Sequence, residues 1–416
     1  MPAARPLADA LRRPGAVLLD GPLADADTGR AGAWLFAAPR ETFVARTLDE
    51  VAPLLDALDA ALAGGHHVAG WLAYEAAAAL EPRLAPRARL PAEPLAWFGA
   101  YDAPEAISET ELRAAFGTEG RVTDVHAGIT EAEYHAGVAR VREHIRQGDI
   151  YQVNLTWPLA FEVAGDGLDL YGAMRERQPT AYGAWVRTSE VDVLSLSPEL
   201  FFRVGSAPEA GSPEASGGAR VITARPMKGT APRGNTPRAD DALARALTAD
   251  AKNRAENLMI VDLLRNDLAR VAAPGSVRVP QLFHAERYPT VTQMTSTVQA
   301  DLARATTLGA VLRALFPCGS VTGAPKLRAM RVIREFEAAP RGVYCGAVGY
   351  AAPAPGGGLG SASFNVPIRT AVVREGRGEY RVGSGIVWDS DAGAEWEECW
   401  LKARPLTDLA SGEAAP

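Results

Sequence analysis

The sequence predicts a mixed α+β fold that is built on antiparallel sheets, not a doubly wound parallel sheet. Predicted strands and helices do not alternate regularly along the chain, as they would around a parallel sheet. Two loose stretches, residues 205–218 and 352–360, are rich in glycine and connect strands that follow each other directly. The composition, with 47% hydrophobic and 22% charged residues, is that of a globular chain with a large core.

The first elements are short apolar strands at residues 16–19 and 33–36 and a helix over residues 48–62. A second helix begins at Thr130, because Thr130 and Glu133 form the pattern of a capping box, and it ends at Gly148.

The next segment, residues 150–163, alternates apolar with polar or small residues, which indicates a strand. Its polar face carries Gln152, Asn154 and Thr156 inside an otherwise apolar region. Such a face predicts a cavity that is lined by polar side chains. The other strands are predicted at residues 181–187, 191–196, 201–204, 221–223, 346–351, 362–373 and 380–387, and the other helices at residues 237–271, 326–336 and 394–403.

The net charge of -7 and the pI near 5.6 argue against binding to nucleic acid or to an anionic membrane. We find neither a signal peptide nor an apolar stretch of the ~18 residues that a transmembrane helix needs, so a cytoplasmic protein is expected. The cysteines are widely spaced and odd in number, which predicts reduced, buried thiols.

Several charged residues are candidates for a site. Glu395, Glu398 and Lys402 share one face of a predicted helix, and Glu256 lies in a strongly apolar helix where a carboxylate needs a partner. Carboxylates from two helices suit Mg²⁺, with water or an anionic substrate completing its coordination. The alternative is that these glutamates are surface or salt-bridge residues.

Lys228 lies between a proline and a glycine on a predicted short turn, where desolvation would make its amine a nucleophile or base. A solvated turn lysine is the alternative. Residues 317–326 combine glycines, hydroxyls and a lysine before a helix, but they lack a Walker ending and therefore predict a general anion cradle. Arg369, on a predicted strand, is a candidate for carboxylate binding or for a structural ion pair.

Taken together, these motifs resemble the chorismate-utilising enzymes. The resemblance runs in order from residue 132 to residue 404. It is carried by residues 148–156, 196–201, 225–230, 255–267, 319–330, 344–350, 364–370 and 383–390, among them GDIYQVNLT, RPMKGT and FNVPIRT.

The resemblance implies a large sandwich of two antiparallel sheets with helices packed outside. Residues 1–115 would contribute to the same sandwich, and residues 116–410 would form the chorismate-binding catalytic region. It further implies that Mg²⁺ binds Glu256 and Glu398, with Glu395 in or near its coordination sphere, and that the metal holds the ring carboxylate. The implied substrate-binding residues are Gln152, Ser320, Thr322, Tyr344, Arg369, Gly383, Gly385 and Lys402.

Within the family, Gln152 resembles the enzymes that use an amine, because those that use water have a lysine base there. Lys228 then resembles the aminodeoxychorismate branch, in which this lysine attacks C2 of the ring and ammonia enters at C4. Glu199 would be the acid that protonates the leaving hydroxyl. Gln293 departs from the histidine of many relatives, so it is assigned no acid/base role.

No cysteine of this chain lies in a nucleophile elbow, so ammonia is expected from solution or from a separate glutamine amidotransferase subunit. Three alternatives remain open. They are an anthranilate-forming enzyme of the same family, a catalytically silent homologue that binds chorismate or tryptophan as a regulator, and a nucleotide-binding protein that uses residues 319–326.

Overall fold

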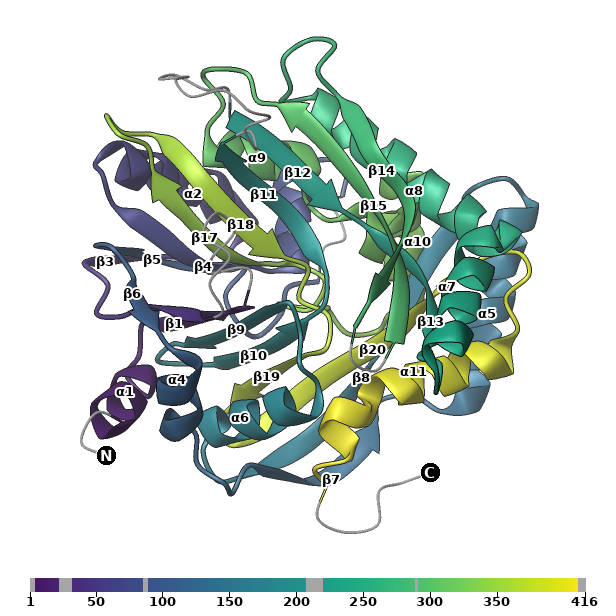
Figure 1. The fold of residues 1–416 in the computed structure, drawn as a ribbon, viewed down its shortest axis with the longest axis horizontal. Helices are drawn as coiled ribbons and strands as arrows, with labels where there is room; N and C mark the ends of the chain where they lie inside the picture. The colour runs from purple at the N-terminus through teal and green to yellow at the C-terminus, as the bar shows by residue number, and fades with distance from the viewer. Residues whose placement is uncertain (1–3, 22–31, 85–88, 207–219, 289–290, 411–416) are drawn as a thin grey trace.

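The computed structural model describes residues 4–21, 32–84, 89–206, 220–288 and 291–410. Within these ranges the chain forms two large antiparallel sheets, and Figure 1 shows most of the helices on their outer sides. The predicted α+β sandwich is therefore confirmed. Most of the loop predicted at residues 205–218 lies outside the described residues.

The first sheet carries the long strand with the alternating pattern near one of its edges. Its order is β16 (Gly323–Ala324), β8 (Gln152–Ala164), β20 (Arg377–Ile386), β19 (Thr370–Arg374), β10 (Asp192–Ser197), β9 (Tyr182–Arg187), β1 (Ala16–Asp20), β2 (Ala33–Phe36) and β6 (Glu105–Ile107), and β7 (Arg121–Ala127) also pairs with β8.

The second sheet carries the strand of Lys228 at its edge. Its order is β13 (Met227–Pro232), β15 (Val291–Asp301), β12 (Arg220–Arg225), β11 (Leu200–Ser206), β18 (Leu359–Asn365), β17 (Ala347–Pro353), β4 (His67–Leu72), β5 (Ala96–Tyr101) and β3 (Glu41–Ala45), and β14 (Arg278–Arg287) also pairs with β15. Strands from the first 115 residues thus take part in both sheets.

The helices are α1 (Ala4–Leu11), α2 (Leu48–Ala63), α3 (Ala77–Leu80), α4 (Glu109–Ala115), α5 (Glu131–Arg146), α6 (Gly167–Arg177), α7 (Pro237–Ala249), α8 (Ala251–Ala269), α9 (Leu308–Leu315), α10 (Lys326–Phe336) and α11 (Ala392–Thr407). The capping box predicted for α5 is present. Helix α8 packs on β15, α11 on β20 and α10 on β8. In Figure 1, α7, α8 and α11 gather at the end of the sandwich where β13 comes close to β20.

The space between the sheets is filled by a buried apolar cluster that draws on strands of both, including Leu19 of β1, Val193 of β10 and Val348 of β17. In it, Trp71 and Trp97 stack with ring centroids 5.5 Å apart. Two larger apolar clusters lie between the sheets and the covering helices. This packing fixes the sheets against each other.

Two predicted elements are wrong in extent. The helix expected over residues 237–271 is two helices, because Asp250 adopts an extended conformation that ends α7, and its side chain accepts a hydrogen bond from Asn253 N to cap α8. The strand expected over residues 362–373 is two strands, β18 and β19, which belong to different sheets. Pro367 and the positive φ of Arg369 interrupt it, so the chain crosses between the sheets there.

Several helices and strands of the structure were not indicated by the sequence patterns, whereas the state of the cysteines was. Strands β3 to β7 and β13 to β16 and helices α1, α3, α4, α6 and α9 were not predicted. All three cysteines are free and buried, as expected. Among the described residues, no helix combines the length and the apolar character required to cross a membrane.

Candidate active site

Lys228 lies on edge strand β13 and not on the short turn that was predicted. The register with β15 shifts between Met227 and Thr230, which marks a bulge at Lys228 and Gly229. Gly229 has a φ of 87°, a left-handed conformation that glycine adopts at low cost. The bulge therefore re-aims the lysine side chain away from the regular ladder.

The Lys228 ammonium faces strand β20 of the opposite sheet at Gly385. A methyl group placed on Gly385 would lie 3.1 Å from Lys228 Nζ and 3.1 Å from Asn154 Oδ1, and it would clash with Gln152 Nε2. Gly385 pairs with Asn154 on β8, so the two strands present Gln152 and Asn154 to the lysine. Side chains from both sheets thus meet beside Gly385, where strand β20 has no side chain.

Gln152 is fully buried, yet neither of its amide atoms has a hydrogen-bond partner among the described residues. The Asn154 Oδ1 atom beside it is likewise buried without a partner. Because buried polar groups are normally hydrogen-bonded, such atoms indicate a place where a polar ligand binds. Asn154 was not among the predicted site residues, although its place on the polar face of the strand was a signal for it.

Glu199 immediately precedes β11 and is 3% exposed. Burial raises the pKa of Glu199 to about 7, although a hydrogen bond from Ser320 and the charge of Lys228 act to lower it. Its Oε1 atom is buried and has no partner in the described part of the chain. A carboxylic acid that keeps its proton near neutral pH is suited to general acid catalysis.

The pKa of Lys228 is shifted by its surroundings. Burial lowers the pKa of Lys228 below its ordinary value, while the carboxylates of Glu256 and Glu199 oppose this effect. Lowering the pKa of a lysine increases the fraction that is neutral and nucleophilic at neutral pH. The pair of Lys228 and Glu199 therefore places a nucleophilic amine and a proton donor within one electrostatic environment.

Helix α11 presents its charged face next to β20. Lys402 Nζ lies 2.6 Å from Glu398 Oε1 and donates to Gly383 O at 2.9 Å. The Glu398 side chain is half exposed, and the Lys402 ammonium outweighs the raising effect of its partial burial, so the pKa of Glu398 lies below its ordinary value. Glu395 accepts a hydrogen bond of 2.8 Å from Ser390. Two of the predicted substrate-binding groups, the Lys402 ammonium and the Gly383 carbonyl, are therefore already hydrogen-bonded to each other.

The three predicted metal ligands belong to one electrostatic environment. Burial raises the pKa of Glu256, and the charges of Glu395 and Glu398 raise it further against the opposing charge of Lys228. In the described ranges, Glu256 forms no hydrogen bond or ion pair, and no three acidic, histidine or cysteine side chains converge into a closed metal cage. An open group of this kind fits Mg²⁺, which uses one or two protein carboxylates together with water and a ligand anion.

Tyr344 and Arg369 lie on two neighbouring segments. Cys345 N donates to Pro367 O at 3.0 Å, and both Cys345 and Arg369 have positive φ values, of 62° and 53°. Strained backbone of this kind is frequent at functional sites. Burial lowers the pKa of Arg369, whose guanidinium has no carboxylate partner among the described residues. It is therefore suited to an anionic ligand and does not form the alternative structural ion pair.

The predicted anion cradle at residues 317–326 is only partly as expected. Lys326 lies 2.6 Å from Asp267 Oδ2 and donates to Leu315 O, so it anchors the loop to α8. The Thr322 hydroxyl donates to the carbonyls of Cys318 and Gly319 and thereby shapes the loop. The Ser320 hydroxyl forms a hydrogen bond of 3.1 Å with Cys318 Sγ, and it acts to lower the pKa of the buried Glu199.

The chain resembles known proteins in both sequence and fold. The family model described as chorismate binding enzyme matches residues 23–408. The chain is 40% identical over 315 residues to anthranilate synthase component 1 of Streptomyces coelicolor, which covers 75% of this chain and 58% of that protein. It is 39% identical over 298 residues to aminodeoxychorismate synthase component 1 of Salmonella typhimurium, covering 71% and 62%. The matched part thus spans about three fifths of the length of these relatives.

A solved structure with this fold is anthranilate synthase component I from Streptococcus pneumoniae. It aligns with a TM-score of 0.70 and 25% sequence identity over 94% of this chain and 90% of that one. The sandwich, the matched family model and the two relatives lead to the same result, and the predicted family is confirmed. The chain belongs to the chorismate binding enzyme family.

Proposed function

We propose that this chain is the chorismate-aminating component of an aminodeoxychorismate synthase, which converts chorismate and ammonia to 4-amino-4-deoxychorismate. One observation carries the proposal: Lys228 faces Gly385 and the unpartnered Gln152 amide, within the electrostatic reach of the buried acid Glu199. An anthranilate-forming enzyme would not use this amine. The similar identities to relatives of both kinds leave the choice to experiment.

The proposed reaction uses the two groups in sequence. The neutral Lys228 amine forms a bond to C2 of the ring, the double bond shifts, and the C4–O bond breaks while Glu199 gives its proton to the departing hydroxyl, which leaves as water. Ammonia then forms a bond at C4, the double bond shifts back, and the bond between C2 and Lys228 breaks. The proton that ammonia loses returns to Glu199.

The remaining groups bind and orient the substrate in this proposal. Glu256 and Glu398 would hold Mg²⁺, which supplies charge neutralisation for the ring carboxylate. Arg369 and Tyr344 would contact the enolpyruvyl carboxylate, and Gln152 would face the ring. Ammonia would come from a separate glutamine amidotransferase subunit or from solution.

The test is the identity of the product. Purified chain is incubated with chorismate, Mg²⁺ and an ammonium salt, and the products are separated and identified by mass and absorbance. We expect aminodeoxychorismate from the natural chain, and from Lys228→Ala little of it together with some anthranilate, because ammonia then reaches C2. If Lys228→Ala forms aminodeoxychorismate at the unaltered rate, covalent catalysis by this lysine is wrong.

A further inference from the structure

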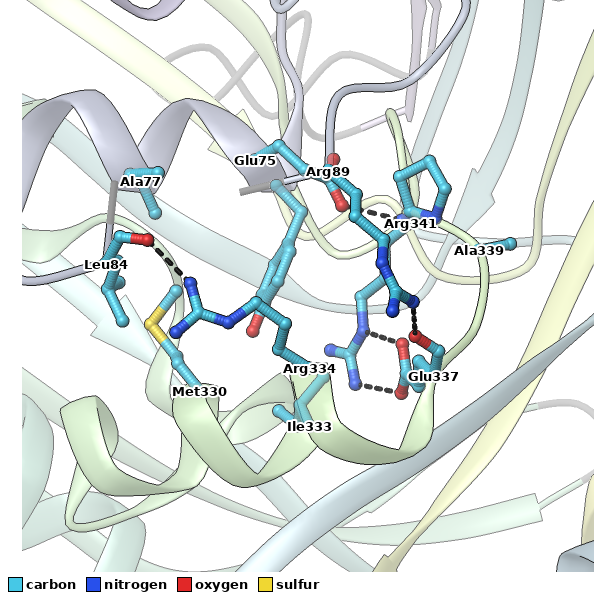
Figure 2. A pocket seen from close by; sticks show the side chains of 13 residues that line it. Glu75, Ala77, Leu84, Arg89, Met330, Ile333, Arg334, Glu337, Ala339 and Arg341 are labelled. Carbon is cyan, nitrogen blue, oxygen red and sulfur yellow. Dashed lines mark hydrogen bonds and ion pairs between the residues drawn. The ribbon is translucent and has the colours of Figure 1, made fainter. Parts of the chain in front are cut away.

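Arg341 is a buried arginine that lies outside the group of side chains described above. Its side chain is 1% exposed, and Figure 2 shows its guanidinium turned toward Glu337 just after helix α10. Two hydrogen bonds, Nε to Oε2 at 2.8 Å and Nη2 to Oε1 at 2.6 Å, form a two-pronged pair with that carboxylate. Its guanidinium carbon also lies 4.6 Å from the centroid of the Tyr74 ring.

The other N–H groups of Arg341 bind two backbone segments of the candidate active site. Nη1 donates to Val321 O at 2.8 Å, next to Ser320, and Nη2 donates to Asn154 O at 2.9 Å, two residues after Gln152. The same two segments also contact each other, because Asn154 N donates to Thr322 O at 2.9 Å. The guanidinium thus joins the strand of Gln152 to the loop of Ser320.

The backbone of Arg341 is itself fixed by the N-terminal part of the chain. Glu75 accepts hydrogen bonds from Arg341 N at 2.7 Å and from Gly342 N at 3.0 Å. Figure 2 shows this contact beside a cavity of about 70 Å³ that Tyr74, Glu75, Glu337 and Arg341 help to line. Because the cavity has room for ordered water, a shorter polar side chain at position 341 can be hydrated in the folded chain.

We propose that Arg341 is a positioning residue, which holds the segments of Gln152 and Ser320 in register at the candidate active site. This rests on the proposed function only in assigning Glu199 as the acid. The planar guanidinium is required because it directs donors at two carbonyls and a carboxylate at once, whereas a lysine ammonium is a compact charge. Substitution by lysine keeps the charge next to Glu337 and removes the planar array of donors.

Arg381 supplies a matched control. It is 2% exposed and lies 3.6 Å from the same carboxylate of Glu337, and it donates to Pro340 O at 3.0 Å. It also donates to Thr156 Oγ1 at 3.4 Å and to Glu379 Oε1 at 3.2 Å, but in the described part of the chain it makes no hydrogen bond to Val321 or Asn154. A lysine at position 381 therefore tests the loss of a buried guanidinium without the loss of the two carbonyl contacts.

The experiment compares Arg341→Lys with Arg381→Lys. Chorismate consumption is followed with saturating Mg²⁺ and ammonium over a range of pH, and thermal unfolding is measured in parallel. We expect similar decreases in the unfolding midpoint, but a kcat for Arg341→Lys at least ten times below that of Arg381→Lys. Arg341→Gln is a second variant, because Arg381 still neutralises Glu337, and it should show the same loss of kcat.

The pH profile supplies a readout that a purely structural role would not change. Burial raises the pKa of Glu199, whereas the Ser320 hydroxyl and the Lys228 ammonium act to lower it; burial also raises the pKa of the Cys318 thiol, which contacts Ser320, to about 12. If Arg341→Lys withdraws the Ser320 hydroxyl, the pKa of Glu199 rises and the alkaline limb of kcat moves to higher pH. Arg381→Lys should leave this limb in place.

Equal kcat losses in the two lysine variants, with no difference in the alkaline limb, would show that Arg341 only stabilises the fold. Failure of the proposed function is a separate outcome. If the natural chain forms anthranilate, the product assignment is wrong, whereas the difference in chorismate consumption between the variants still reports on positioning.

Discussion

Replacing Gly385 with alanine tests the central juxtaposition of the site. The added methyl group would lie 3.1 Å from Lys228 Nζ and from Asn154 Oδ1, and it falls short of van der Waals contact distance to Gln152 Nε2 by about 1 Å. Gln152 is fully buried and cannot move into solvent, so the amide, the lysine or strand β20 must shift. Overpacking of this kind costs about 1–3 kcal/mol of stability.

The effect on catalysis should exceed the effect on stability. A misplacement of about 1 Å between reacting groups costs roughly a hundredfold in rate, so kcat should fall about 100-fold while the chain stays folded. The control is Gly393→Ala near the start of α11, where a methyl group would meet only Asp391 Oδ1 at 3.4 Å. Chorismate consumption and thermal unfolding are measured for both. A Gly385→Ala enzyme with unaltered kcat would refute the placement of Lys228 against β20.

Three further outcomes are expected. Glu199→Gln should lower kcat by about 10²–10⁴-fold and abolish the decline of kcat above the pKa of Glu199 at about 7, because the proton donor is lost; a decline that persists would place the acid elsewhere. Glu398→Gln should raise the Mg²⁺ concentration for half-maximal activity by about tenfold or more, while the same change at its neighbour Glu397, which is likewise exposed, should not, and equal Mg²⁺ titrations would contradict a metal role. With glutamine as the nitrogen donor, aminated product should appear only after a separate amidotransferase is added. Its formation by the purified chain alone would disprove the need for a partner.

The sequence allowed the strands with clear alternation to be predicted, and strand β8 with Gln152 is an example. The family resemblance was also visible in the sequence, because each motif is a short run of consecutive residues. The motifs can therefore be read without the fold that brings them together. What it did not reveal were features that depend on pairing across the sheets. Strand β13 has no apolar alternation, since its bulge at Gly229 breaks the period of two. Helix α8 merges with α7 in the hydropathy pattern, because Asp250 ends one and caps the other.

The contacts of Arg341 could not be predicted for a related reason. Its partners at Asn154 and Val321 are backbone carbonyls, and a backbone carbonyl leaves no trace in residue type. Conversely, Lys326 matched the expected pattern of an anion-binding loop, yet it pairs with Asp267 from a helix far away in the sequence. Local motifs therefore identified the segments that line the site, and only the folded chain shows which of their side chains are already paired.

The place of Lys228 on an edge strand has a consequence for how this fold acquires new chemistry. Strand β13 pairs along the sheet path only with β15, and the bulge already lifts Lys228 out of the regular ladder. A substitution at residue 228 alters no regular backbone pairing of this strand, although its side chain lies in a buried polar environment. The residue proposed to decide the reaction outcome is thus separated from the strand pairing that holds the sheet together, so the chemistry at this position can change without a change in sheet topology.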